Sequence, residues 1–155
     1  MRRLALLALI AATSAQAMEA GLTDTSARGF IARQDAVWNA RDAHAFAATF
    51  TPDALFVDQA IGSDGKLVAN GHSTLAQATA QSRRFFAKTR FRETVAVDRV
   101  VIAADARTAH VFAHTTTRLE SPARTYCART EQTLVLAHGR ILSQGQTDTD
   151  IRCPK

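Results

Sequence analysis

The sequence predicts an α+β domain in which three helices pack on one face of a strongly curved antiparallel sheet. Two observations carry this prediction. Segments with helical apolar spacing dominate the chain before residue 88, and four alternating or β-rich segments with short turns follow. Helices grouped ahead of consecutive strands are typical of α+β proteins. A curved sheet that helices close on one side forms a cone, so the fold class also predicts an enclosed pocket.

The expected elements follow from local spacing and capping. Helices are expected over about residues 24–40, 42–50 and 74–88, and a strand hairpin over about 54–69 separates the last two. Asp42 and Ser73 are expected to cap the second and third helices, because their side-chain oxygens accept hydrogen bonds from the first free N–H groups. Four strands, over about 91–103, 108–120, 125–137 and 140–151, should form an antiparallel meander because only short turns join them.

The chain begins with the features of a secretory signal peptide. Arg2 and Arg3 precede an apolar run too short to span a bilayer, and Ala15-Gln16-Ala17 is a small-x-small cleavage site. This order favours a signal peptide over a buried N-terminal helix. We therefore expect residues 1–17 to be removed. The remainder, residues 18–155, should be a single exported domain, periplasmic or secreted, that does not insert into a membrane.

Charge and cysteine content limit the partners. The formal net charge of +5 falls by two when the signal peptide is removed, and most of the remaining basic residues are scattered. The one dense cluster, over residues 83–92, lies at an expected helix end, where cations favour the macrodipole. We therefore expect no nucleic-acid partner for this exported chain.

Cys127 and Cys153 are expected to form a disulfide, because an even number of cysteines in an exported chain favours pairing. A hairpin turn over residues 137–140 would place Cys127 opposite about residue 150. A bulge or a frayed strand end would then close the remaining gap to Cys153.

Asp58 is the first candidate for chemistry. It follows the apolar, β-prone residues 54–57 and precedes a turn containing Gly62 and Gly65, so we expect a buried strand that ends in a carboxylate. A buried acid is costly unless it is paired, hydrated or used in catalysis. One interpretation is a general base that takes a proton next to a carbonyl. The structural alternative is an Asp that caps the following turn.

A second candidate region is the strand over residues 108–120. His110, Phe112, His114, Thr116 and Arg118 share one face at the period of two, and a polar yet aromatic face is typical of a pocket wall. His110 and His114 would be about 13 Å apart, too far to hold one metal ion. We therefore expect no metal site, with His114 as a catalytic candidate or as a hydrogen-bonded wall residue. Phe112 and Thr116 are substrate-binding candidates.

Other residues are candidates for binding a ligand. Trp38 and Phe56 would contribute aromatic surface, and His72 would either cap the third helix or line the pocket mouth. Asp148 would either line the pocket or pair across the sheet with Arg118 or Arg129. No phosphate loop or dinucleotide fingerprint occurs, so no cofactor is expected.

Three segments, Trp38 to Asp42, Phe50 to Asp58 and Asn70 to His72, resemble the N-terminal half of NTF2-like proteins. Within that superfamily the pattern is similar to the SnoaL-like polyketide cyclases, the DUF4440 group and ketosteroid isomerase. The resemblance covers about residues 25–151. It implies a cone-shaped fold with a pocket and frequent dimerisation through the sheet face, but this fold hosts many functions.

The similarity to ketosteroid isomerase implies roles for single residues. Asp58 stands at the position of the acid that moves the proton. Counting back from the last hairpin turn places Glu131 at the position of the second acid, which is protonated. Gln34 occupies the position of the third member, a Tyr, and it donates a far less acidic hydrogen bond. This departure argues against steroid isomerase activity as such.

We therefore expect an NTF2-like cone that binds a small hydrophobic or aromatic molecule. It would catalyse acid–base proton transfer of isomerase, cyclase or lyase type with Asp58, Glu131 and His114, assisted by Gln34. One alternative is a non-catalytic module that carries or sequesters its ligand. Another is an interaction protein whose exposed sheet face forms a homodimer.

Overall fold

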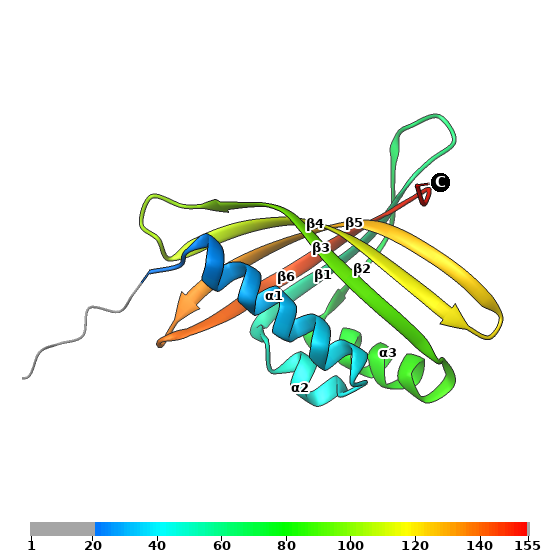
Figure 1. Cartoon of the computed structure of the whole chain (residues 1–155), viewed down its shortest axis with the longest axis horizontal. Helices are drawn as coiled ribbons and strands as arrows, with labels where there is room; N and C mark the ends of the chain where they lie inside the picture. The colour runs from blue at the N-terminus through cyan, green and yellow to red at the C-terminus, as the bar shows by residue number, and fades with distance from the viewer. Residues whose placement is uncertain (1–20, 155) are drawn as a thin grey trace, which may run out of the picture.

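The computed structural model describes residues 21–154, and it is an α+β fold with helices on one face of a curved, mostly antiparallel sheet (Figure 1). The strand order is β2-β1-β6-β5-β4-β3. All neighbouring pairs are antiparallel except β1 and β6, which are parallel. The predicted fold class is therefore confirmed. The predicted signal peptide, residues 1–17, lies outside the described residues.

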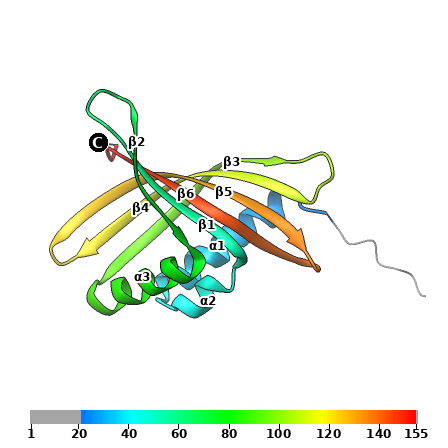
Figure 2. The same ribbon diagram turned by 180° about the vertical axis from the view of Figure 1, so that it is seen from behind.

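The three helices begin at well-formed caps. Helix α1 spans Asp24–Asn39, α2 spans Ala43–Ala47 and α3 spans Leu75–Lys88. Asp42 caps α2 as predicted, but α3 is capped by Thr74 rather than Ser73, whose side chain is buried. Helix α1 packs against β3, and α3 packs against β1 and β2 (Figure 2). Over residues 21–154, no helix is both long and apolar enough to cross a bilayer.

The first two strands are longer than the sequence pattern predicts, whereas the last four lie close to their predicted ranges. Strand β1 begins at Phe50, directly after α2, because the chain is already extended through Thr51 and Pro52. The bounds are Phe50–Ile61 for β1, Leu67–Thr74 for β2, Phe91–Ile102 for β3, Thr108–Glu120 for β4, Ala123–Ala137 for β5 and Arg140–Ile151 for β6.

Strands β1 and β6 approach closely at Gly145, which interrupts their register. The φ of Gly145 is 142°, and a Cβ there would stand 2.0 Å from the carbonyl oxygen of Leu55. Only glycine tolerates both conditions. The parallel pairing of β1 with β6 therefore depends on this residue.

The hydrophobic core lies between α1 and the middle of the sheet. Ala27, Phe30 and Ile31 of α1 pack there with Val111 of β4 and Leu134 of β5. A second, aromatic cluster surrounds Trp38 near the C-terminal end of α1. The two clusters together fix α1 across the concave face of the sheet.

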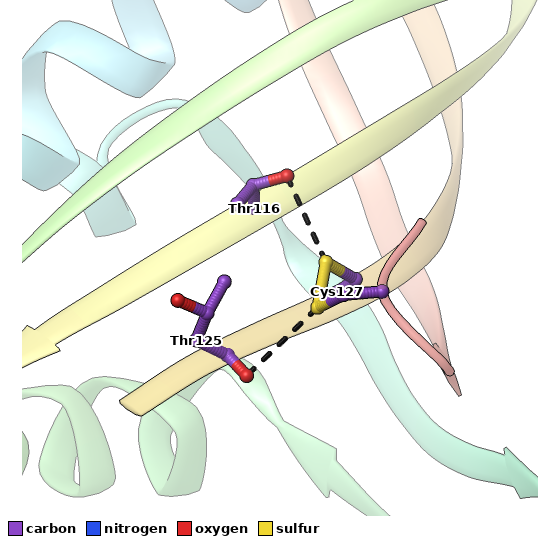
Figure 3. The surroundings of a disulfide bond; sticks show 4 residues. Thr116, Thr125 and Cys127 are labelled. Atoms are coloured by element: carbon purple, nitrogen blue, oxygen red, sulfur yellow. Dashed lines mark hydrogen bonds between the residues drawn. A yellow bond between two sulfur atoms is a disulfide. The ribbon is translucent and has the colours of Figure 1, made fainter. Parts of the chain in front are cut away.

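The predicted disulfide between Cys127 and Cys153 is present, with a Cα–Cα distance of 5.1 Å (Figure 3). A bulge near Gln132 shifts the β5–β6 register so that Cys127 lies opposite Ile151, and the chain beyond β6 brings Cys153 back to it. The Thr116 hydroxyl and the Thr125 carbonyl oxygen lie 3.9 Å and 3.8 Å from the two sulfur atoms. The bond therefore ties the C-terminal tail to β5.

Candidate functional site

A cavity of about 500 Å³ lies between the concave face of the sheet and helices α1 and α3. We call it the cone cavity. Its wall is formed by the three helices and by inward-facing residues of all six strands, among them Val111, Thr115, Thr130 and Gln146. Its size is typical of sites that bind small organic molecules.

Aromatic side chains form the apolar part of the wall. Trp38, Phe46, Phe56 and Phe85 all line the cone cavity. The ring centroid of Trp38 is 4.8 Å from that of Phe46 and 6.2 Å from that of Phe85. These contacts immobilise the rings, so the aromatic surface is preorganised for an apolar ligand.

Five carboxyl groups form the charged part of the wall, namely Asp35, Asp58, Glu93, Asp148 and Asp150. No Lys, Arg or His is among the described residues that line the cone cavity. Three different elements carry the acids other than Asp35, so the sheet curvature brings together groups that are far apart in sequence.

Glu93 is held in place by contacts on both its backbone and its side chain. Asn39 at the end of α1 accepts a hydrogen bond from the Glu93 N–H (2.8 Å) and donates one to the Glu93 carbonyl (3.0 Å). The Thr117 hydroxyl donates to Glu93 Oε2 at 2.7 Å. Glu93 on β3 is thus held by hydrogen bonds to both α1 and β4.

The pKa of Glu93 is raised from 4.5 to about 7. Burial is the main cause, and the negative charges of Asp148 and Asp35 add to it. The hydrogen bond from Thr117 opposes the rise, as does the nearby Trp38 indole, although its buried N–H makes no well-formed hydrogen bond. Glu93 is therefore near half-ionised at neutral pH, which suits proton transfer.

Asp148 is a second acid with a raised pKa, and burial is again the main cause. Thr130 donates to its Oδ1 at 2.7 Å and Gln146 donates to its Oδ2 at 2.6 Å, which lowers the pKa in part. The charges of Asp58 and Asp150 raise it further. Asp148 thus interacts electrostatically with Glu93, deep in the cone cavity, and with Asp58 at its mouth.

Three glutamine amides continue this network along the floor of the cone cavity. The Gln132 Nε2 group donates to Gln34 at 2.9 Å and to Gln146 at 3.1 Å, and Gln34 donates to Thr49 at 2.9 Å. The buried Gln132 Oε1 has no hydrogen-bond partner among the described residues. Gln34, predicted as a donor to the substrate, instead uses its N–H on Thr49.

The structure brings five of the predicted site residues to the cone cavity: Gln34, Trp38, Phe56, Asp58 and Asp148. Asp58 differs from the prediction, because its strand is only partly buried: Ala54 is buried, but Leu55 is 47% exposed and Asp58 itself is exposed at the cavity mouth. Leu55 faces the outer side of the sheet, which no helix of residues 21–154 covers, whereas Asp58 is exposed because it lies at the opening of the cavity. The pKa of Asp58 is still raised, first by partial burial and then by the charge of Asp150.

The prediction that His110, Phe112, His114, Thr116 and Arg118 form a pocket wall is wrong, because the neighbouring residues Val111, Ala113, Thr115 and Thr117 line the cone cavity. His114 is exposed on the outer face, where it pairs with Asp98. Phe112 lies in a shallow hollow on that outer face, and Thr116 contacts the disulfide.

Glu131 and His72 also lie outside the cone cavity. Glu131 is exposed in the outer hollow, and Gln132 takes the inward position next to it. A displacement of one residue along a strand moves a side chain to the opposite face. His72 is exposed on β2, while its neighbour Ser73 faces the cavity.

Sequence reasoning missed Glu93, Asp35, Asp150 and Gln132. A signal for Glu93 was present, because Phe91, Glu93, Val95 and Val97 alternate on one face of β3, and an acid within an apolar stripe is a candidate for a functional group. Within residues 21–154, no group of three or more His, Cys, Asp or Glu side chains is arranged to hold a metal ion.

Comparisons with known proteins agree with this architecture. No protein-family model matches the chain, and no curated protein matches its sequence. Among solved structures, it is similar to an NTF-2 like protein of unknown function from Shewanella oneidensis MR-1, with a TM-score of 0.64, 10% identity and coverage of 81% of this chain and 98% of that one.

Two further solved structures share the fold. A ketosteroid isomerase-like protein from Erwinia carotovora atroseptica SCRI1043 has a TM-score of 0.60 and 15% identity over 81% of this chain and 94% of that one. ActVI-ORFA from Streptomyces coelicolor has a TM-score of 0.56 and 21% identity over 81% and 95%. The fold is therefore the NTF2-like cone that the sequence resemblance implies, and acids line its cavity in this chain.

Proposed function

We propose that this protein is an exported NTF2-like protein that binds a small hydrophobic or aromatic molecule in the cone cavity and catalyses proton transfer on it, in an isomerase, cyclase or lyase type of reaction. One observation carries the proposal: Glu93, whose pKa is raised to about 7, lies in an aromatic-lined cavity beside a second acid, Asp148. General acids and bases work best when their pKa is close to the working pH.

The proposed step needs no redox partner. The Glu93 carboxylate takes a proton from a carbon next to a carbonyl, and the electron pair of the broken C–H bond moves to the carbonyl oxygen. Asp148, whose pKa is raised by burial, donates a hydrogen bond to that oxygen when it carries a proton, and Glu93 then returns the proton to the same or a neighbouring carbon. Asp58 at the cavity mouth is the alternative base. His114 and Glu131 have no part in this proposal, because both face away from the cavity.

The chemical test follows exchange of the protons next to the carbonyl of 2-tetralone, a small bicyclic aromatic ketone, in deuterated water by NMR. We expect the protein to accelerate exchange, with a rate that rises as the pH rises through about 7, because the base must be ionised. Glu93→Gln should lower this acceleration at least tenfold. Glu131→Gln makes the same substitution on the exposed face and should leave it unchanged.

Two outcomes would contradict the chemical part. One is an acceleration that survives Glu93→Gln, Asp148→Asn and Asp58→Asn together. The other is binding of 2-tetralone without any acceleration of exchange, which would favour a non-catalytic carrier of the same ligand.

A packing test addresses binding alone. Ala128 lines the cone cavity, whereas Ala96 is exposed on the outer face of β3. Ala128→Phe should fill part of the cavity and abolish binding of 2-tetralone, and Ala96→Phe should not. Equal binding by both variants would place the ligand elsewhere.

We also propose that two copies associate through the outer sheet face. No helix of the described residues covers this face, and Leu55 and Val101 on it are 47% and 43% exposed. Sedimentation should find a dimer, and Leu55→Asp should convert it to a monomer. A monomeric wild-type protein at micromolar concentration would refute this part.

A further inference from the structure

The charged side chains that line the cone cavity, among the described residues, are all acidic. Five carboxyl groups line it, and no described Lys, Arg or His does. For Glu93 and Asp148 in the cavity and Asp58 at its mouth, no cation is among the causes that shift the pKa. The charge of Arg92 does lower the pKa of Asp35. The structure therefore supplies these carboxylates with hydrogen bonds but with almost no compensating charge.

We propose that the ligand of the cone cavity is a hydrophobic molecule that carries an ammonium group, with the ammonium between Glu93 and Asp148 and the apolar body against the aromatic wall. This inference rests on the ligand-binding part of the proposed function, and it names the class of ligand. It does not rest on the proton-transfer step, because an ammonium group held there pairs with both acids in their ionised form.

The electrostatic argument concerns what a buried carboxylate requires. An ionised acid that leaves water is stabilised by a proton, by a metal ion or by an opposite charge. Burial and the charges of neighbouring acids raise the pKa values of Glu93 and Asp148, so both acids retain a proton more readily in the absence of a cation. An ammonium group would replace that proton, whereas an anionic ligand would add to the repulsion.

A metal ion does not fit this cavity as an alternative cation. In the part of the chain that the structure describes, no three acidic, His or Cys side chains converge as metal ligands do. The acids are instead spread around the wall, on α1, β1, β3 and β6. A distributed set of charges suits an organic cation, which needs no fixed coordination geometry.

The aromatic wall supports the same class of ligand. Trp38 has the strongest ring quadrupole among the aromatic residues, and it lies beside Phe46 and Phe85 on the cavity wall. Such rings attract a cation to their faces while they bury the hydrocarbon next to it. The juxtaposition of Trp38 with Glu93 therefore provides both kinds of contact for an alkyl or aryl amine.

Gln132 gives an independent indication. This residue lines the cone cavity and is only 7% exposed, and its Oε1 has no partner although its Nε2 donates twice. A buried acceptor without a donor is costly. A ligand N–H would satisfy it, whereas a ligand that only accepts hydrogen bonds would not.

The test uses four compounds with one bicyclic skeleton and different charges: 2-aminotetralin (cationic at neutral pH), 2-tetralol and 2-tetralone (both neutral) and tetralin-2-carboxylic acid (anionic). Trp38 is the only tryptophan of the chain and lines the cavity, so its fluorescence reports occupancy, and calorimetry provides an independent measurement. We expect the amine to bind at least tenfold more tightly than the alcohol, and the acid to bind most weakly.

Variants separate charge from shape. Glu93→Gln and Asp148→Asn keep the volume of each side chain and remove its charge. Each should weaken binding of the amine at least tenfold while the Kd of 2-tetralol changes less than threefold. Glu131→Gln, on the outer face, should change neither.

The outcomes distinguish the two proposals. Equal or tighter binding of the alcohol or the acid overturns the ammonium inference and leaves the binding function standing. Tighter binding of the amine that is unaffected by both variants also overturns it, because the charge would then act elsewhere. Failure of all four compounds to bind overturns the proposed function and this inference with it.

Discussion

Replacing Glu93 by Gln should make the folded protein more stable at alkaline pH, although it removes a hydrogen-bonded residue. Gln retains an oxygen that accepts the Thr117 hydroxyl, at 2.7 Å in the wild type, and it retains the backbone contacts with Asn39. What it loses is an acid that the fold holds in an unfavourable charged state. The effect on the free energy of unfolding is therefore dominated by ionisation.

The magnitude follows from the pKa. The pKa of Glu93 rises from 4.5 to about 7 on folding, which corresponds to about 3 kcal/mol. Because the folded state binds this proton more tightly than the unfolded state does, the contribution is fully present below about pH 4.5 and is lost as the pH rises through about 7. Relative to wild type, Glu93→Gln should thus gain about 3 kcal/mol between pH 4 and pH 9.

Urea denaturation at several pH values measures this difference, with the disulfide intact. Comparing variant and wild type at each pH cancels the titrating groups that do not interact with Glu93, and Asp148 and Asp35 remain coupled to it. Glu131→Gln provides the matched control, because Glu131 is exposed on the outer face. A difference for Glu93→Gln that is constant from pH 4 to pH 9, or that equals the control, would falsify the reasoning.

Three further predictions concern stability, each measured by urea denaturation at pH 7. Gly145→Ala should lower the free energy of unfolding by at least about 3 kcal/mol, because its Cβ would stand 2.0 Å from the backbone of β1. Gly65 also has a positive φ, 78°, but open space around it, so Gly65→Ala should lower the free energy of unfolding by only about 1–2 kcal/mol. Asn39→Ala should lower the free energy of unfolding by about 2 kcal/mol, because it removes both hydrogen bonds from the Asn39 side chain to the backbone of Glu93. A loss under about 0.5 kcal/mol would contradict this. Replacing Cys127 and Cys153 by Ser should cost about 3 kcal/mol, since the bond closes a 26-residue separation, and a reducing agent should have no further effect on that variant.

Local physics explains which parts of the fold were predictable. Helices α1 and α3 follow from apolar spacing and capping, and the β3–β6 meander follows from short turns between β-rich segments. The parallel pairing of β1 with β6 was not predictable, because it joins residues about ninety positions apart through Gly145, whose role depends on its neighbour.

The candidate site was predictable only in part. Gln34, Trp38 and Phe56 were assigned to the pocket and they line it, because they lie at the expected helix face and strand position. Glu131, His114 and Phe112 were placed on the wrong face. In β4 both faces carry apolar and polar residues, so alternation identifies two faces without identifying which one α1 covers.

The sequence by itself determined the types of the elements, the disulfide pairing and the presence of acids on the strands, because these depend on neighbours along the chain or on a single hairpin register. The tertiary structure decided which face is concave and which acids are buried. It alone brings Asn39, Glu93, Thr117 and Asp148 together, and the raised pKa of Glu93 arises from that burial and from charges contributed by other elements. Asp58 thus remains a residue of the cavity mouth, and the deep acid of the site is Glu93.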